Sequence, residues 1–435
     1  MGFCPGCGGA APLVEVPAAP GRRAPARAAR VVPLTAVGPE EAVRRPTGID
    51  EVDRVLGGGL VPGATLLVAG EPGVGKSTLL LQVAGSLAAA GGTVLIASAE
   101  ESAAQVALRA GRLGLAQSGV LLAAESDVDA IVAAADRARP DLLVVDSIQT
   151  VAAAEVGGTP GGVAQVREAA ARLVHFSKES GVPVVLVGHV TKDGSIAGPR
   201  LLEHAVDVVL YLEGDVERGL RVLRSLKNRF GATHQVGLFE MGDAGMRPVP
   251  DPSGWLLGGW KGEVPRSVVF PSVEGRRPLL VEVQALVSPA GVATPRRSVR
   301  GLEAARVHQV LAVLERHAHF RMADRDVYVS VVGGLQVRDP GVDLPVAIAL
   351  VSSFLDKPLG PTAAWGEVGL TGEVRAVAYG ERRAAEAARL GVKVAVGATG
   401  NGGDRIERAL ARAGLPPASP PGRSPQRPGA QDGGA

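Results

Sequence analysis

A glycine-rich run from Gly70 to Ser77 holds the residues of this chain with the clearest chemistry. It reads Gly-Glu-Pro-Gly-Val-Gly-Lys-Ser and matches the spacing G-x-x-x-x-G-K-S. Glycines here let backbone N–H groups turn toward a phosphate, and the following helix adds partial positive charge. We expect Lys76 to reach the β- and γ-phosphates of ATP and Ser77 to bind Mg²⁺. The predicted nucleotide-binding residues are Gly70, Glu71, Pro72, Gly73, Val74, Gly75, Lys76, Ser77 and Thr78.

Polar side chains follow three further apolar runs. Asp146 closes the run LLVVD and is predicted to hold the Mg²⁺ shell, as a Walker B aspartate does, or else to cap the next helix. Glu100 and Glu101 follow TVLIASA, and one of them is expected to polarise the attacking water. We favour Glu100, which falls directly at the strand end; a solvated pair is the alternative. His189 is either a γ-phosphate sensor or a structural histidine.

The apolar runs indicate how these residues are positioned. From Pro46 to about Gly245, short runs rich in Val, Leu and Ile alternate with Ala-rich helical stretches. This alternation is typical of buried parallel strands in an α/β sheet. The predicted strands are residues 64–69, 93–97, 142–146, 183–188 and 206–212.

Composition shifts divide the chain into domains and linkers. Residues 17–45 are rich in Ala, Pro and Arg and are predicted to be a flexible linker. Residues 246–264 are rich in Pro, Gly and Trp and predict a second linker, and the Pro/Gly-rich residues 416–435 predict a disordered tail. The predicted domains are an α/β nucleotide-binding domain at 46–245 and an α+β domain at 265–415, with a helix around 301–318.

Overall composition excludes several classes of protein. The chain has 435 residues, with 46 Lys and Arg against 44 Asp and Glu, so it is not basic throughout. Two cysteines, Cys4 and Cys7, are too few for a disulfide-stapled secreted fold. No run reaches the ~18 apolar residues of a membrane span, and no signal peptide is evident. We therefore expect a cytoplasmic protein without membrane contact.

Longer motifs carry a resemblance to a known family. They are GHVTKDGSIAGPRLLEHAVDVVLYLEGD at 188–215, KNRFG at 227–231, PGGVAQVRE at 160–168 and TPRRSVRGLEAARVHQVLAVLE at 294–315. With the glycine-rich run they resemble the bacterial DNA repair protein family RadA, also called Sms, over roughly residues 46–413. The resemblance implies a RecA-like P-loop NTPase domain followed by an α+β Lon-protease-like domain.

The resemblance also implies roles for individual residues. Glu100 takes the place of the catalytic glutamate of RecA-like ATPases. Residues 151–166 and 191–201, the second with Lys192 and Arg200, occupy the positions of two DNA-facing loops. The cations Lys227 and Arg229 of KNRFG would act across a subunit interface on a neighbour's ATP, or in coupling to DNA, which requires a ring or filament. Composition alone gives these two cations an ordinary surface ion-pair role instead.

The Lon-like domain lacks its expected catalytic residues. The helix that carries the nucleophilic serine in Lon proteases begins here with Gly341-Val-Asp343-Leu-Pro345, and Ser352 and Ser353 come two to three turns later. Where a lysine would activate that serine, the chain offers Arg382 and Arg383, which stay protonated. We expect a proteolytically inactive scaffold for oligomerisation and DNA binding. Its candidate DNA-binding residues are Arg296 and Arg297, with Arg300 and Arg306, expected in and beside the first helix, or else a solvated helix face.

The N-terminus departs from the family pattern. The family begins with a four-cysteine zinc finger, whereas residues 1–16 contain only Cys4 and Cys7, resembling its second half. Structural zinc needs four protein ligands, and the chain has no other cysteine. These two cysteines are therefore expected to bind zinc only if the finger is completed.

Together, motifs and resemblance predict a DNA-dependent ATPase in recombinational DNA repair that uses ATP and Mg²⁺. Its expected partners are single-stranded DNA, branched recombination intermediates, further copies in a hexameric ring, and the RecA recombinase, and hydrolysis would drive branch migration. Two alternatives stay open: an ATP-dependent Lon-like protease, and an ATP-gated RecA-like assembly protein without motor activity.

Overall fold

The sheet that carries the glycine-rich run combines parallel and antiparallel strands. The computed structural model describes residues 33, 43–116, 118–189, 201–214, 219–233, 235–258, 260, 266–291, 294–333, 335–397 and 404–416. Cys4, Cys7, Lys192 and Arg200 lie outside these residues. The chain divides into two units, Met1–Val43 and Arg44–Ala435, and the elements below belong to the second.

The first sheet has nine described strands in the order β3-β2-β4-β5-β1-β6-β7-β8-β9. The strands from β3 to β6 run parallel, which confirms the expected α/β fold. The antiparallel extension β7–β9 was not anticipated. Most of β9 and all of α7 lie inside the predicted linker 246–264. The strands are β1 (Thr65–Gly70), β2 (Val94–Ser98), β3 (Leu121–Ala123), β4 (Leu142–Asp146), β5 (Val184–His189), β6 (Val208–Gly214), β7 (Leu220–Asn228), β8 (Val236–Gly242) and β9 (Gly245–Pro248).

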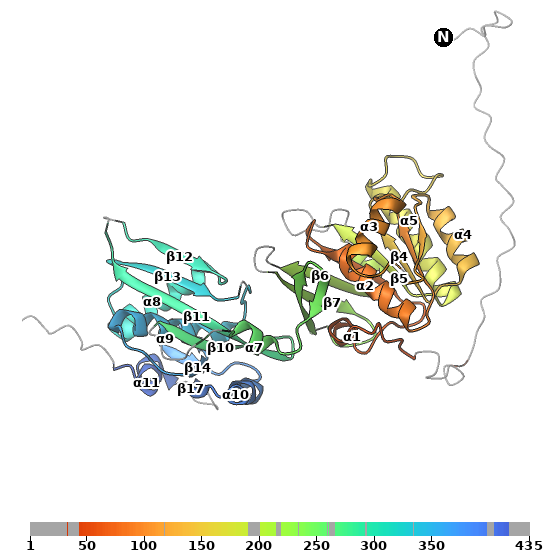
Figure 1. The fold of residues 1–435 in the computed structure, drawn as a ribbon. Coiled ribbons are helices and arrows are strands. Elements are labelled where there is room, and N and C mark those ends of the chain that lie inside the picture. Colours follow the sequence, from red (N-terminus) through yellow and green to blue (C-terminus); the bar gives the residue numbers. More distant parts are fainter. Residues whose placement is uncertain are drawn as a thin grey trace, which may run out of the picture. The chain divides into compact units, whose positions relative to one another are not determined.

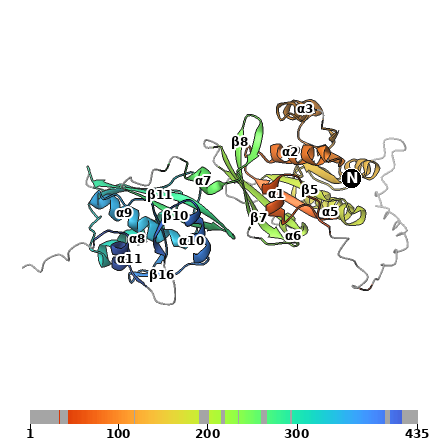
Figure 2. The same ribbon diagram turned by 60° about the horizontal axis from the view of Figure 1, so that its bottom comes forward.

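Helices cover both faces of this sheet, as Figures 1 and 2 show. Alternate residues of β1 serve two cores: Leu66 and Val68 pack with α1 and α2, whereas Leu67 and Ala69 pack with α4 and α5. This two-sided burial explains why the central strands are nearly continuous apolar runs. The helices are α1 (Asp50–Leu56), α2 (Lys76–Ala89), α3 (Ala103–Arg112), α4 (Val128–Ala138), α5 (Val163–Ser180), α6 (Leu201–Ala205) and α7 (Pro252–Leu256).

The second half contains a mixed six-stranded sheet, β12-β13-β11-β10-β14-β17, and a small sheet, β15-β16-β18. Helices α8, α9, α10 and α11 pack against them, so the expected α+β character is present. The elements are β10 (Ser267–Glu274), β11 (Arg277–Pro289), β12 (Arg297–Arg300), α8 (Ala304–His317), β13 (Arg325–Val331), the 3₁₀ turn η3 (Pro340–Val342), α9 (Asp343–Leu355), β14 (Thr362–Trp365), β15 (Glu367–Val368), β16 (Glu373–Arg375), α10 (Gly380–Arg389), β17 (Lys393–Gly397), β18 (Asp404–Arg405) and α11 (Ile406–Arg412).

One local expectation about this half is wrong. Arg297 and Arg300 belong to strand β12, Arg296 directly precedes it, and α8 begins only at Ala304. Pairing with β13 holds residues 297–300 extended. The spacing 296/300 therefore does not place two guanidinium groups on one helix face.

Candidate nucleotide-binding site

The predicted phosphate-binding residues converge at one edge of the first sheet. Gly70 of β1 pairs with His189 of β5, and Ser98 of β2 pairs with Asp146 of β4, so four parallel strands end together. The loop between β1 and α2 lies over this edge. A cavity of about 300 Å³ opens there, lined by Gly73, Gly75, Lys76, Ser77, Thr78, Glu100, Glu101, Arg109, Arg112, Asp146 and His189.

Two glycines of the loop are required by its geometry. Gly75 has φ +110°, a conformation that L-residues with a side chain rarely adopt. A Cβ at Gly70 would lie 2.3 Å from the backbone oxygen of Leu212 on the neighbouring strand β6. The loop can therefore turn tightly between β1 and α2 only with glycine at these positions.

Lys76 is a buried cation that rests on neutral acceptors. Its side chain is 4% exposed, and Nζ donates to the carbonyl oxygens of Gly70 at 2.8 Å and Glu71 at 3.0 Å. Nζ also lies 3.2 Å from Nδ1 of His189. Burial lowers the pKa of Lys76, against the attraction of Asp146 and Glu100. A polyphosphate would supply the anion that this buried ammonium lacks.

His189 joins Lys76 to Glu100. With Nδ1 accepting from Lys76, the other ring nitrogen carries the proton and donates to Glu100, whose Oε2 is 3.3 Å from Nε2. Glu100 is therefore the one of the two adjacent glutamates that is linked to the phosphate-binding lysine. The role of Glu100 in polarising water stays a prediction.

Asp146 fits a magnesium ligand. Its carboxylate shares a hydrogen bond with Ser77, and burial raises its pKa, as do the nearby Glu100 and Glu101 carboxylates. The three carboxylates and the hydroxyls of Ser77 and Thr78 that line this cavity are oxygen donors of the kind that Mg²⁺ prefers. Ser77 and Asp146, together with the nucleotide's phosphates, would hold Mg²⁺. The bound ion would relieve the electrostatic repulsion among these carboxylates.

Arg109 and Arg112 line the same cavity but were not predicted. Both lie on α3, which begins with a capping box between Ser102 and Gln105 and carries no buried residue. Arg109 Nη2 donates to Glu101 Oε1 at 2.6 Å. The available sequence signal was their i, i+3 spacing on the helix that directly follows the two glutamates.

The two KNRFG cations have partners within the same chain. Lys227 Nζ donates to the backbone oxygens of Glu203 and Val206, each at 2.7 Å, at the C-terminal end of α6. Burial lowers the pKa of Lys227, and nearby Arg229 adds to this effect. Arg229 forms an ion pair with Asp207 at 3.0 Å. Both contacts lie directly after the segment 190–200, which is outside the described residues.

In the second half, the serines and the arginine near the expected protease site form hydrogen bonds and an ion pair within the protein. Arg383 is 2% exposed and pairs with Asp339 at 2.6 Å. Ser352 Oγ donates to the Lys357 carbonyl at 2.6 Å, and Ser353 Oγ accepts the N–H of Val287 at 2.9 Å. Both serines are buried, so neither is presented to a substrate as a nucleophile would be.

Arg296 and Arg297 differ in whether their guanidinium groups are free to contact a ligand or are already hydrogen-bonded to the protein. Arg297 donates to the backbone oxygens of Arg325 and Met322, the latter at 2.7 Å. Arg296 is exposed, and its backbone N–H donates to Asp326 at 2.7 Å. Of the two, Arg296 has the side chain that is better placed for a ligand in solution.

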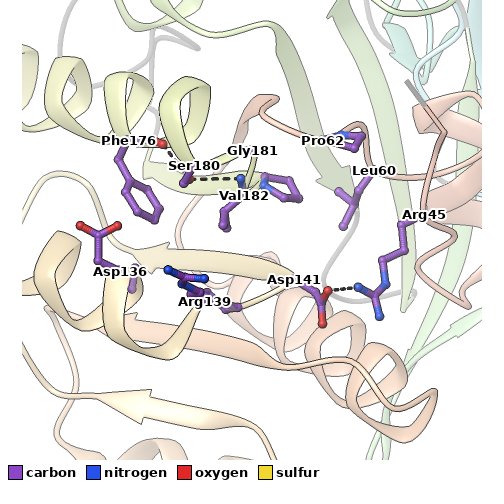
Figure 3. A pocket seen from close by; sticks show the side chains of 13 residues that line it. Arg45, Leu60, Pro62, Asp136, Arg139, Asp141, Phe176, Ser180, Gly181 and Val182 are labelled. Carbon is purple, nitrogen blue, oxygen red and sulfur yellow. Dashed lines mark hydrogen bonds and ion pairs between the residues drawn. The ribbon is translucent and has the colours of Figure 1, made fainter. Parts of the chain in front are cut away.

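A second cavity lies at the opposite edge of the first sheet, where β1, β4 and β5 begin. It has a volume of about 650 Å³ and is shown in Figure 3. Arg45 and Asp141 form an ion pair across its rim, and Phe176 of α5 supplies apolar surface. None of the predicted site residues lines this cavity. Among the described residues, no helix is long and apolar enough to cross a membrane.

A glycine-rich loop before a helix, with Asp146 and Glu100 at neighbouring ends of a parallel sheet, defines a RecA-like P-loop protein. A model of the AAA domain family matches residues 34–195. The "DNA repair protein RadA" of Brucella abortus is 46% identical over 415 residues, 92% of this chain and 89% of the relative. That of Bacillus subtilis is 45% identical over 402 residues, 90% of this chain and 88% of the relative. The chain therefore belongs to the RadA family of DNA repair proteins. Among solved structures, a KaiC-like protein of Pyrococcus horikoshii, 22% identical, aligns with a TM-score of 0.40 over 48% of this chain and 100% of its own.

Proposed function

We propose that this chain is a DNA-dependent ATPase of recombinational DNA repair, working in the cytoplasm. The observation that carries the proposal is the convergence of Lys76, Ser77, Glu100 and Asp146 on one cavity, in a chain of the RadA family. These four residues provide phosphate binding, Mg²⁺ binding and a carboxylate for the attacking water.

The chain's own residues divide the work of hydrolysis. Lys76 exchanges its carbonyl partners for phosphate oxygens, and the backbone N–H groups of the loop hold the phosphates in place. Glu100 orients water for attack on the γ-phosphate as general base. Bound Mg²⁺ supplies charge neutralisation at the phosphates. His189, in contact with both Lys76 and Glu100, is placed to transmit the state of the γ-phosphate to the segment that follows it.

DNA is the proposed effector of this ATPase. Residues 151–166 and 191–201, with Lys192 and Arg200, would face single-stranded DNA in the channel of a hexameric ring. Hydrolysis would drive translocation and branch migration of recombination intermediates, in cooperation with RecA. The second half would be a proteolytically inactive scaffold for oligomerisation, with Arg296 and Arg297 contributing phosphate contacts.

We assign Lys227 and Arg229 to the subunit interface of that ring. Both cations lie at the end of strand β7, and Arg229 is about half exposed despite its ion pair with Asp207. A cation supplied to a neighbour's ATP stabilises transition-state charge. In this proposal Lys227 and Arg229 exchange their contacts within the chain for contacts to a neighbour when the ring binds ATP.

ATP hydrolysis by the purified chain tests the proposal, measured with and without single-stranded DNA at two salt concentrations. We expect stimulation by DNA that falls at high salt, because phosphate contacts release counterions. Hydrolysis that is indifferent to DNA would refute the DNA-dependent part while leaving the ATPase. Negligible turnover with DNA and Mg²⁺ would favour an ATP-gated assembly protein. Cleavage of casein would favour the protease.

A further inference from the structure

We propose that Arg109 of α3 is a catalytic residue that contacts the γ-phosphate from within the same subunit. This inference rests on the proposed ATPase function and goes beyond it, because it adds a cation in cis to the phosphate-binding set. The structure connects Arg109 to the nucleotide cavity through its position, its partner and its surroundings.

Arg109 shares the cavity with the residues that are predicted to bind Mg²⁺ and the phosphates. It lines the cavity together with Ser77 and Asp146. Glu101, its partner, directly follows Glu100. In this proposal, a γ-phosphate held by Lys76 in this cavity comes within reach of the Arg109 guanidinium.

The present partner of Arg109 is one that a phosphate can replace. The Arg109–Glu101 pair is partly open to solvent, with side chains 24% and 30% exposed. Ion pairs of this kind contribute little to stability because water screens them. An arginine–phosphate contact is bidentate and charge-assisted, and thus stronger. Glu101 can lose its partner at small cost because its carboxylate reaches water.

The pairing also separates the two adjacent glutamates by role. Glu101 holds Arg109, whereas Glu100 is linked to Lys76 through His189. Without nucleotide, Arg109 is therefore paired with Glu101, whereas Lys76 is connected to Glu100 through the His189 ring. Nucleotide binding would release both cations toward phosphate and leave Glu100 facing the attacking water.

Arg109→Ala, Glu101→Gln and the control Arg137→Ala test this proposal. Arg137 is an exposed arginine on α4, away from the cavity. We expect Arg109→Ala to lower kcat at least tenfold and to weaken binding of fluorescent AMPPNP at least fivefold, with ADP binding unchanged within twofold. Arg137→Ala should keep kcat within threefold of the unmodified chain, and the loss in Glu101→Gln should be smaller than that in Arg109→Ala, because a γ-phosphate replaces Glu101 as the partner of Arg109.

Three results would overturn the proposal. Equal losses in Arg109→Ala and Glu101→Gln would show that Arg109 only tethers α3 to Glu101. Equal weakening of AMPPNP and ADP binding would indicate a generally disturbed site, and unchanged kcat would remove the catalytic role. The nucleotide-binding measurements need no hydrolysis. A chain that binds AMPPNP without turnover would thus fail the proposed function while still testing Arg109.

Discussion

The two halves of this molecule stabilise a buried cation in different ways, as Lys76 and Arg383 show. Lys76 is 4% exposed and rests on two carbonyl oxygens and a histidine ring. Arg383 is 2% exposed and has a carboxylate partner in Asp339, with further hydrogen bonds to the carbonyl oxygens of Ala378 and Pro271. The first cation borders a cavity, and the second is held by the protein itself.

The difference distinguishes a binding site from a structural cluster. A buried charge with neutral acceptors is stabilised incompletely, so an incoming anion gains from meeting it. A buried charge with a carboxylate partner and satisfied donors has nothing to gain from a ligand, and removing either partner leaves the other unpaired. Substitutions at Lys76 should therefore affect activity, and substitutions at Arg383 should affect folding.

Lys76→Ala gives the largest expected effect. We expect ATP turnover to fall at least ~100-fold, because a preorganised cation aimed at the phosphates is lost. The free energy of unfolding without nucleotide should fall by less than ~1 kcal/mol or rise, since the lost charge was poorly stabilised. Turnover and urea unfolding measure the two effects, with Lys178→Ala on the exposed face of α5 as control. Full activity in Lys76→Ala would contradict the P-loop assignment.

Arg383→Met tests the other half of the comparison. It leaves Asp339 buried without its partner, and we expect a loss of ~3–5 kcal/mol in the free energy of unfolding. The matched control is Arg382→Ala, because the neighbouring Arg382 is exposed and donates to the Arg276 carbonyl. Asp339→Leu combined with Arg383→Met should recover only part of the loss, because the N–H groups of Val273 and Gly341 lose their acceptor. A single variant as stable as the unmodified chain would show that the cluster is not structural.

Sequence reasoning succeeded where chemistry is local and failed where partners are distant. The glycine spacing and the run LLVVD placed Lys76, Ser77 and Asp146 correctly at one edge of the sheet, because parallel strands end together. Arg109 was missed because the sequence of a short helix does not show which of its side chains face the cavity. Two partners of Arg383, Pro271 and Asp339, are 112 and 44 positions away in the sequence, beyond the reach of any local pattern.

The arginines near residue 300 show the same limit in secondary structure. Their spacing predicted one helix face, but pairing with β13 makes residues 297–300 a strand. The antiparallel extension β7–β9 was also missed, since its register depends on pairing rather than on composition. Tertiary contacts, not intrinsic propensity, decided both segments.

Lys227→Ala tests a cation that shares features of both the binding-site cation Lys76 and the structural cation Arg383. Its ammonium donates to neutral backbone oxygens, as that of Lys76 does to Gly70 and Glu71. It also caps the end of α6, as a structural residue would. We expect a loss of ~1–2 kcal/mol in unfolding free energy from the lost helix-end contacts. If Lys227 also acts across an interface, mixing Lys227→Ala with Lys76→Ala subunits should restore part of the turnover. No rescue at any mixing ratio would leave Lys227 with a role in its own chain alone.

The pH dependence of the unfolding free energy gives the smallest expected effect and tests directly whether Lys76 is incompletely stabilised. Because burial lowers the pKa of Lys76, the unfolded chain binds more protons than the folded one between that lowered pKa and the ordinary lysine value. Stability without nucleotide should therefore rise with pH in this window, by less than ~1.4 kcal/mol per pH unit. Lys76→Met lacks the effect, so the difference in unfolding free energy between the two chains should shift in favour of the unmodified chain as pH increases. Saturating ATP should reverse the shift, because phosphates favour the ammonium form. A difference that stays constant from neutral to alkaline pH would mean that Lys76 is as well stabilised by its carbonyl partners as Arg383 is by Asp339.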